Sequence, residues 1–323
     1  MSQNTIKNMQ TNHTTIYAGI DVAKATLQLH LQGHQTEFGN QAAGLDQLCK
    51  KLKSVPHVQV VCEATGGYER ALVRALQQAQ IPVSVTNPAQ VRAAARAQGQ
   101  RAKTDRIDAA LLSDYGQRYQ PKPTPVISTN QDKLIALTQW LKQLIQGRAL
   151  AKTQSEHHQD PFVCRQHSKL LEHLKTQIEA VEKQIKSLLA TDAALQQRVD
   201  RLDEIEGVGP RTAWMVLAHM PELGQLNRRE VAALAGLAPW TRDSGTMKGM
   251  RCIGGGRPEV RLALYMASLS AVRCNPVLRS LYQNLRSKQK PPKVALTAAM
   301  RRLLLFMNHQ IKTLIDKPTE KKS

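Results

Sequence analysis

Four carboxylates in the N-terminal part of the chain have the surroundings of a metal site. Asp21 lies near the end of an apolar run, and Glu63 directly follows a second one. Asp105 and Asp108 are three residues apart, so on a helix they share one face. Clustered acids repel one another unless cations neutralise them, and their hard oxygen atoms suit Mg²⁺ or Mn²⁺. The set predicts a divalent-metal site able to act on a phosphodiester.

The elements that must position these acids predict an α/β domain with a mixed sheet over residues 16–125. Its expected order is strand, strand, helix, strand, helix, strand, helix, at 16–22, 27–31, 45–52, 57–62, 68–79, 81–85 and 105–119. Functional groups gather at strand ends in open sheets, so the acids are expected to meet there. Taken singly, each acid would be an ordinary solvated charge. Three prolines then indicate a linker: Pro121, Pro123 and Pro125.

A glycine-rich turn within residues 202–213 (Leu-Asp-Glu-Ile-Glu-Gly-Val-Gly-Pro-Arg-Thr-Ala) is a second candidate site. The pattern is typical of a helix-hairpin-helix, in which the backbone approaches a phosphate and the next helix presents its N–H groups. Gly207, Gly209 and Arg211 are therefore expected to bind the DNA backbone without reading base sequence. An ordinary tight turn between helices is the alternative.

Ser244 precedes a glycine in a predicted loop that is rich in cations. This setting suits a hydroxyl that faces a phosphate, and four nearby cations are candidate nucleic-acid ligands: Arg242, Lys248, Arg251 and Arg257. A loop or capping serine is the alternative. No histidine lies nearby to act as a base, so a nucleophilic Ser244 would be activated from elsewhere, and the carboxylate-bound metals are the obvious source.

Leucines and isoleucines at heptad-like spacing predict two long helices in the middle of the chain, joined near Asp160-Pro161. They fit either an oligomerising coiled coil or an intramolecular helical hairpin. From about residue 200 the chain is predicted to be helical and rich in Gly and Arg.

The charge of the whole chain points to a polyanionic partner. Lys and Arg number 45 against 25 Asp and Glu, which gives a net charge of +20 and an isoelectric point near 10.0. Nucleic acid is the leading candidate. No long apolar segment favours a membrane role, and five scattered cysteines suit reduced thiols in a cytoplasm. Aromatic residues make up only 4%, which argues against single-strand stacking as the main binding mode.

Several motifs, in order along the chain, resemble the IS110 family of insertion-sequence transposases, of the DEDD type. They are Gly-Ile-Asp-Val-Ala-Lys at 19–24, Cys-Glu-Ala-Thr-Gly-Gly-Tyr at 62–68, Lys-Thr-Asp-Arg-Ile-Asp-Ala at 103–109, Ile-Glu-Gly-Val-Gly-Pro at 205–210, and Gly-Leu-Ala-Pro at 236–239 leading to Ser244-Gly245. The resemblance covers essentially the whole chain after its first residues.

This resemblance implies a RuvC-like (RNase H fold) first domain with Asp21, Glu63, Asp105 and Asp108 as a metal-binding acidic tetrad. Ser244 would attack a DNA phosphodiester and form a covalent 5′-phosphoserine link. The implied partners are donor and target double-stranded DNA, a structured guide (bridge) RNA, and other copies of the chain in a homodimer that assembles into a homotetramer. A bacterial cytoplasmic location is implied.

Together these expectations divide the chain into five segments. They are a disordered tail (1–15), a RuvC-like DEDD domain (16–125), a coiled-coil or helical connector (126–200), a mostly α serine transposase domain with a helix-hairpin-helix (201–315) and a basic tail (316–323). Two rival functions remain: a RuvC-like junction nuclease that uses metal-activated water without Ser244, and a non-catalytic helix-hairpin-helix protein that binds nucleic acid.

Overall fold

The computed structural model describes residues 15–97, 99, 105–240 and 251–316, except for the side chains of Asp105 and Arg106. The chain divides into two compact units, the first ending at Val126 and the second beginning at Ile127. Apart from Thr15 and Asp316, both predicted tails lie outside the described residues.

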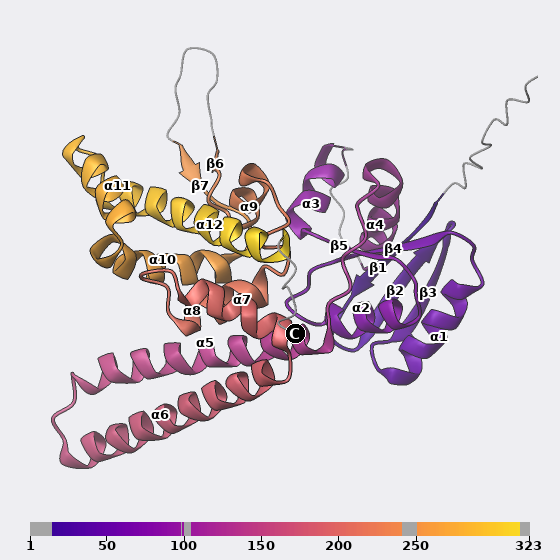
Figure 1. Cartoon of the computed structure of the whole chain (residues 1–323). Coiled ribbons are helices and arrows are strands. Elements are labelled where there is room, and N and C mark those ends of the chain that lie inside the picture. Colours follow the sequence, from indigo (N-terminus) through magenta and orange to yellow (C-terminus); the bar gives the residue numbers. More distant parts are fainter. Residues whose placement is uncertain (1–14, 98, 100–104, 241–250, 317–323) are drawn as a thin grey trace, which may run out of the picture. The chain divides into compact units, whose positions relative to one another are not determined.

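A five-stranded mixed sheet forms the centre of the first unit, in the order β3-β2-β1-β4-β5 (Figure 1). The strands are β1 Ile16–Val22, β2 Thr26–Leu31, β3 His34–Gly39, β4 Val58–Glu63 and β5 Val83–Thr86. β1, β2 and β3 are antiparallel neighbours, whereas β4 runs parallel to β1, and β5 parallel to β4. The predicted α/β class with a mixed sheet is confirmed.

The helices of this unit are α1 Ala42–Lys53, α2 Glu69–Gln78, α3 Pro88–Ala97 and α4 Asp105–Tyr119. Because side chains alternate along a strand, the sheet has two different faces. Ile20 and Cys62 point into a core that α1 and α2 complete with their leucines. Tyr17 and Val61 point to the opposite face and pack against Leu112 of α4.

The proline-rich segment 121–125 does more than link the units, because it hydrogen-bonds to β5. Thr124 donates its backbone N–H to the Val83 carbonyl at 2.7 Å, and its hydroxyl accepts from the Val85 N–H at 2.9 Å. The buried side chain of Gln59 donates to the Pro121 carbonyl at 2.7 Å. The segment therefore occupies hydrogen-bonding groups at the edge of β5.

Two long helices, α5 Thr129–Ser155 and α6 Pro161–Ala190, open the second unit and pack along each other as a hairpin (Figure 1). Asp160 caps α6 by accepting from the backbone N–H groups of Phe162 and Val163, and Pro161 begins the helix. The predicted junction near Asp160-Pro161 is confirmed. Within one chain the two helices form the hairpin alternative, and a role in oligomerisation stays a prediction.

The remainder of the second unit is mainly helical, as predicted. Its elements are α7 Ala193–Asp203, α8 Pro210–His219, α9 Arg228–Leu234, β6 Pro239–Trp240, β7 Cys252–Ile253, α10 Pro258–Cys274, α11 Pro276–Ser287 and α12 Pro292–Asp316. One continuous apolar core joins α7, α8, α10 and α12 to the bases of α5 and α6. Among the described residues, no helix is long and apolar enough to cross a membrane.

The structure adds β3, α3 and the β6–β7 ribbon to the predicted elements. β3 is absent from the predicted elements because its sequence, His-Gln-Thr-Glu-Phe-Gly, lacks an apolar alternation, and the strand lies at the sheet edge. α3 was hidden in the basic stretch after Pro88. The β6–β7 ribbon has only two residues in each strand, too few for a periodic signal.

Candidate active site

Asp21 and Glu63 lie at the same end of neighbouring parallel strands. The register between β1 and β4 pairs Ile20 with Cys62, and one further step places Asp21 beside Glu63. Adjacent strands are about 4.8 Å apart, so these two carboxylates leave the sheet as neighbours. Both have the parity of Tyr17, which faces α4. The sequence-based expectation that the two acids meet at strand ends agrees with this register.

Helix α4 runs along β1 at very close range. A Cβ at Gly19 would lie 2.0 Å from the Ala109 carbonyl oxygen, so only glycine permits this approach. Further back along the strand, Gly116 stands directly against the Tyr17 side chain, and the Ser113 hydroxyl donates to the Tyr17 carbonyl at 2.8 Å. The part of α4 that contacts β1 therefore shifts from Gly116, opposite Tyr17, to Ala109, opposite Gly19, which is closer to the first turn of α4.

Continuing that progression by two strand residues brings Asp21 opposite the first turn of α4, which contains Asp105 and Asp108. The strand advances by about 6.6 Å in two residues, which corresponds to four or five residues of helix. The described side chain of Asp108 is half-buried, and the side chain of Asp105 lies outside the described set. Among the described side chains, no three acids or other ligands are close enough together to hold a metal ion.

Glu69 stabilises the turn that follows Glu63. Its carboxylate accepts from the Gly67 N–H at 2.8 Å, the Thr65 hydroxyl at 3.0 Å and the Thr65 N–H at 3.1 Å. Partial burial acts to raise the pKa of Glu69, but hydrogen bonds from its own N–H, Gly67 and Thr65 outweigh that effect and lower the pKa. Positive φ angles at Gly66 and Gly67 allow the chain to make this turn.

Asn40 connects the segments that follow Asp21 and Glu63. Its side-chain amide donates to the Ala23 carbonyl at 3.0 Å and to the Tyr68 carbonyl at 3.3 Å. Neither Asn40 nor Glu69 was among the predicted site residues. Glu69 gave a weak signal, since an acid in the first turn of a helix after Thr-Gly-Gly is typical of a capped start. Asn40 gave none, because its partners are distant in sequence.

In the second unit, the glycine turn lies between α7 and α8, and the helix-hairpin-helix predicted there stays a prediction. A Cβ at Gly207 would lie 2.5 Å from the Ala271 Cα, so this glycine, with φ of +91°, lets the turn pack against α10. Gly209 caps α8 and has open space around its Cα. Gly207 thus has a packing role, and Gly209 remains the glycine able to approach a phosphate.

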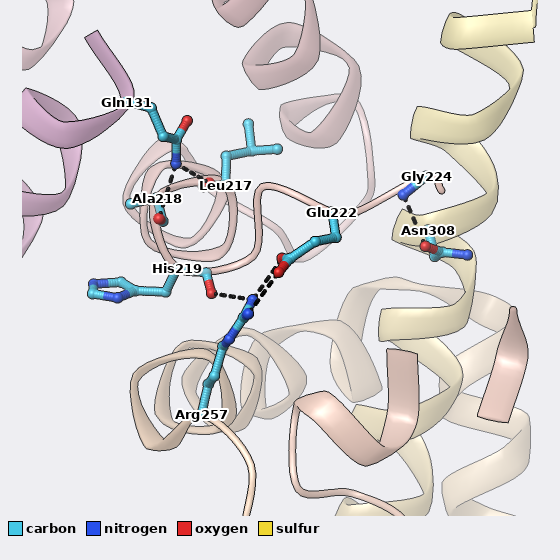
Figure 2. Close-up of polar contacts among 8 residues, drawn as sticks. All are labelled: Gln131, Leu217, Ala218, His219, Glu222, Gly224, Arg257 and Asn308. Carbon is cyan, nitrogen blue, oxygen red and sulfur yellow. Dashed lines mark hydrogen bonds and ion pairs between the residues drawn. The ribbon is translucent and has the colours of Figure 1, made fainter. Parts of the chain in front are cut away.

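Two of the cations predicted to bind nucleic acid form ion pairs within this unit. Arg211 contacts Glu182 of α6. Arg257 makes a bidentate contact with Glu222, with both N–O distances 2.7 Å, and donates to the His219 carbonyl at 2.8 Å (Figure 2). Partial burial acts to raise the pKa of Glu222, but the hydrogen bond and charge of Arg257 outweigh it and lower the pKa.

Neighbouring polar contacts fix the same region. Gln131 of α5 donates to the carbonyls of Leu217 and Ala218 at the end of α8, at 2.8 and 2.9 Å (Figure 2). Asn308 of α12 accepts from the Gly224 N–H at 2.8 Å. These contacts join α5 to α8, and α12 to the loop after α8 that also carries Glu222, the partner of Arg257.

Ser244, Arg242 and Lys248 lie outside the described residues, between the strands β6 and β7. Arg251 directly precedes β7 and is exposed. Below the ribbon the backbone is tightly packed: a Cβ at Gly236 would lie 2.2 Å from the Gly255 carbonyl oxygen, and the Arg257 N–H donates to the Leu234 carbonyl at 2.8 Å. The residues before and after the segment that carries Ser244 are thus closely packed against each other.

Comparisons with known proteins agree on one family. Residues 18–163 match a DEDD family described as "Transposase", and residues 199–283 match the "Transposase IS116/IS110/IS902 family". The pilin gene-inverting proteins of Moraxella bovis and Moraxella lacunata are each 29% identical over 302 residues, covering 89% of this chain and 93% of the relative. A structure of Thermus thermophilus RuvC with a Holliday junction substrate covers 34% of this chain and 99% of its own, with 17% identity and a TM-score of 0.28.

The chain belongs to the IS110 family of transposases, because the two matched regions together span most of it. It is therefore an enzyme of DNA transposition and recombination. The mixed sheet with helices on both faces agrees with the RuvC-like fold that the family resemblance implied.

Proposed function

We propose that this chain cuts and rejoins DNA strands through a covalent phosphoserine link formed by Ser244. The observation that supports this most directly is the placement of Asp21 and Glu63 side by side, on the face of the sheet where the first turn of α4 approaches. The two acids form a neighbouring pair at adjacent strand ends, to which the first turn of α4 would add Asp105 and Asp108.

The donor chemistry fits a hard divalent cation, with Mg²⁺ as the preferred ion and Mn²⁺ as a substitute. Asp21, Glu63, Asp105 and Asp108 are the proposed ligands. When bound, such a metal supplies Lewis-acid stabilisation of the phosphate and the attacking and departing oxygens. Because three suitable ligands do not meet among the described side chains, the proposal requires Asp105, which begins α4. Asn40 and Glu69 would hold the adjoining turns in place.

The proposed reaction balances without any further reagent. The Ser244 oxygen loses its proton, bonds to phosphorus and displaces the 3′ oxygen of the neighbouring nucleotide, which gains a proton. The strand is left with a 5′-phosphoserine end and a free 3′-hydroxyl. A 3′-hydroxyl from another strand then attacks the same phosphorus and releases Ser244. Energy of the phosphodiester is conserved, so strands can be exchanged rather than only cut.

We also propose that the chain binds a structured guide RNA and two DNA duplexes, with base pairing supplying sequence choice. The net charge of +20 supports a partner with many phosphates. Copies of the chain would associate as a homodimer and then a homotetramer. Exposed apolar side chains on the helical hairpin, Leu150 and Phe162 among them, support contact between copies.

Two relatives favour a second use of the same chemistry. The Moraxella proteins are named for inverting a pilin gene, and they align with nearly the whole of this chain. Inversion and transposition differ in the arrangement of the recombining sites, not in the bonds formed and broken. A plasmid with two inverted target sites would show inversion as a reversed restriction pattern, whereas element excision would shorten the plasmid.

The deciding experiment incubates the purified protein with Mg²⁺, the element-flanking RNA, and labelled donor and target DNA. A denaturant-resistant protein–DNA band is expected for the wild type and lost in Ser244→Ala and Asp105→Ala. Ser280→Ala and Asp46→Asn, which change an exposed serine and an exposed acid, are the matched controls and should retain the band. DNA cleavage without a band, unchanged in Ser244→Ala, would replace the proposal with a metal-dependent junction nuclease.

A further inference from the structure

An open groove of about 680 Å³ lies in the second unit, between helix α12 and the first residues of α9 and α11. Its floor is apolar and includes Leu226, Leu278 and Leu303. Phe306 projects into it from α12 and is 42% exposed, and Val277 on the opposite wall is 61% exposed. Large apolar side chains left accessible in a hollow indicate a binding surface rather than unfinished core.

The groove has a basic rim and no carboxylate among the described residues that line it. Arg228, Arg302 and Lys312 supply the charges, and His309 lies between the last two along α12. None of the three cations is paired with an acid among the described residues. The groove therefore suits a ligand whose negative charges face the basic rim and whose apolar groups face the apolar floor.

We propose that this groove binds an unpaired DNA strand, with bases against Phe306 and phosphates against the basic rim. Arg302 and Lys312 are ten residues apart on one helix, or about 15 Å along its axis. That length matches on the order of four stacked nucleotides. A cationic track with an aromatic ring between its charges is the arrangement that binds single strands. A duplex would leave the apolar floor empty, because its bases are stacked and paired inside.

The polar groups of the groove favour DNA over RNA. The side-chain oxygens of Asn227 and Asn275 accept from backbone N–H groups at the starts of α9 and α11. The oxygen of Asn308 accepts from Gly224, and its nitrogen donates to the Leu226 carbonyl. The amide oxygens of Asn227 and Asn275 each accept two hydrogen bonds, so neither has a free lone pair for the proton of a ribose 2′-hydroxyl, a group that deoxyribose lacks. The groove proposal depends on the proposed function in one respect, because strand exchange would be the source of the unpaired DNA.

The test measures fluorescence anisotropy of labelled oligonucleotides of about twelve nucleotides with the full chain, in the absence of divalent metal. Three probes share one sequence: single-stranded DNA, single-stranded RNA and duplex DNA. Phe306→Ala should weaken single-stranded DNA binding at least about five-fold, and leave duplex binding within about two-fold. Phe306→Tyr should retain binding. Tyr265→Ala, which removes an aromatic ring of similar exposure from α10 (40% against 42%), is the matched control.

Lys312→Gln should lower the slope of log Kd against log salt by about one phosphate contact. Equal behaviour of Phe306→Ala and Tyr265→Ala would overturn the proposal, and so would a larger loss for RNA than for DNA. Thermal melting of each variant checks that the fold is retained, and Phe306→Tyr tests the ring without removing it. Because Ser244→Ala should still bind all probes, failure of the groove and failure of the phosphoserine chemistry are separate results.

Discussion

Removing the guanidinium of Arg257 should destabilise the second unit rather than simply weaken DNA binding. Arg257→Met deletes three charge-assisted hydrogen bonds, two to Glu222 and one to the His219 carbonyl. The Arg257 and Glu222 side chains are 32% and 25% exposed, so water replaces part of what is lost. After that discount we expect a loss of about 2–3 kcal/mol in the free energy of unfolding.

For a unit of this size the loss corresponds to a fall in Tm of roughly 5–10 °C, measurable by circular dichroism or differential scanning fluorimetry. Arg201→Met is the control, because its ion pair with Glu204 lies on the exposed surface and should contribute less than about 1 kcal/mol. Adding Glu222→Leu to Arg257→Met should recover part of the loss, because the stranded carboxylate is removed as well.

The pH dependence provides an independent check. Arg257 holds the pKa of Glu222 below its usual value, so the stabilisation is present at neutral pH and is lost as the pH falls through the lowered pKa. The difference in Tm between wild type and Arg257→Met should therefore shrink in acid. A fall in Tm no larger than that of the Arg201 control, together with a salt slope reduced by about one, would refute this reasoning. Arg257 would then be a phosphate ligand, as its sequence context predicted.

Four further substitutions test the first unit and the hairpin. Gly19→Ala should push α4 away from β1, because the new Cβ would meet the Ala109 carbonyl, and should lower the free energy of unfolding by about 1–3 kcal/mol with loss of the covalent adduct. Gly147→Ala, on open helix surface, should instead raise the free energy of unfolding by about 0.5–1 kcal/mol. Chemical denaturation measures both changes. Glu69→Gln should lower Tm at neutral pH, with the difference vanishing as the pH falls through the lowered pKa of Glu69. Gln131→Leu should lower Tm by several degrees, because two carbonyls at the end of α8 lose their buried donor.

Much of the first unit could be predicted because its central elements carry regular apolar patterns. The bounds of β1 and α4 agree with the sequence-based prediction, and β4 ends at Glu63, one residue beyond the predicted strand 57–62. β3 and α3 could not be found the same way, since an edge strand and a basic surface helix bury too few side chains to impose a period. Tertiary contacts, rather than local pattern, determine those elements.

The candidate site divides similarly. Parallel strands bring their carboxyl ends to one edge of a sheet, so the sequence could predict that Asp21 and Glu63 are neighbours. The pairing of Arg211 with Glu182 and of Arg257 with Glu222 did not follow, because the partners are 29 and 35 residues away in sequence. Cation-rich composition indicates a binding surface, but only the fold determines which cations are already neutralised.

The contact between the proline-rich segment and β5 has a consequence for biosynthesis. Thr124 is 39 residues beyond Val85, whose N–H it accepts, so β5 emerges from the ribosome well before its edge can be covered. During that interval the strand presents unsatisfied backbone groups to other nascent chains, which is the setting in which strand pairing between molecules begins. Truncation before residue 121 would make that interval permanent, so fragments of the first unit should be expressed with the whole proline-rich segment included.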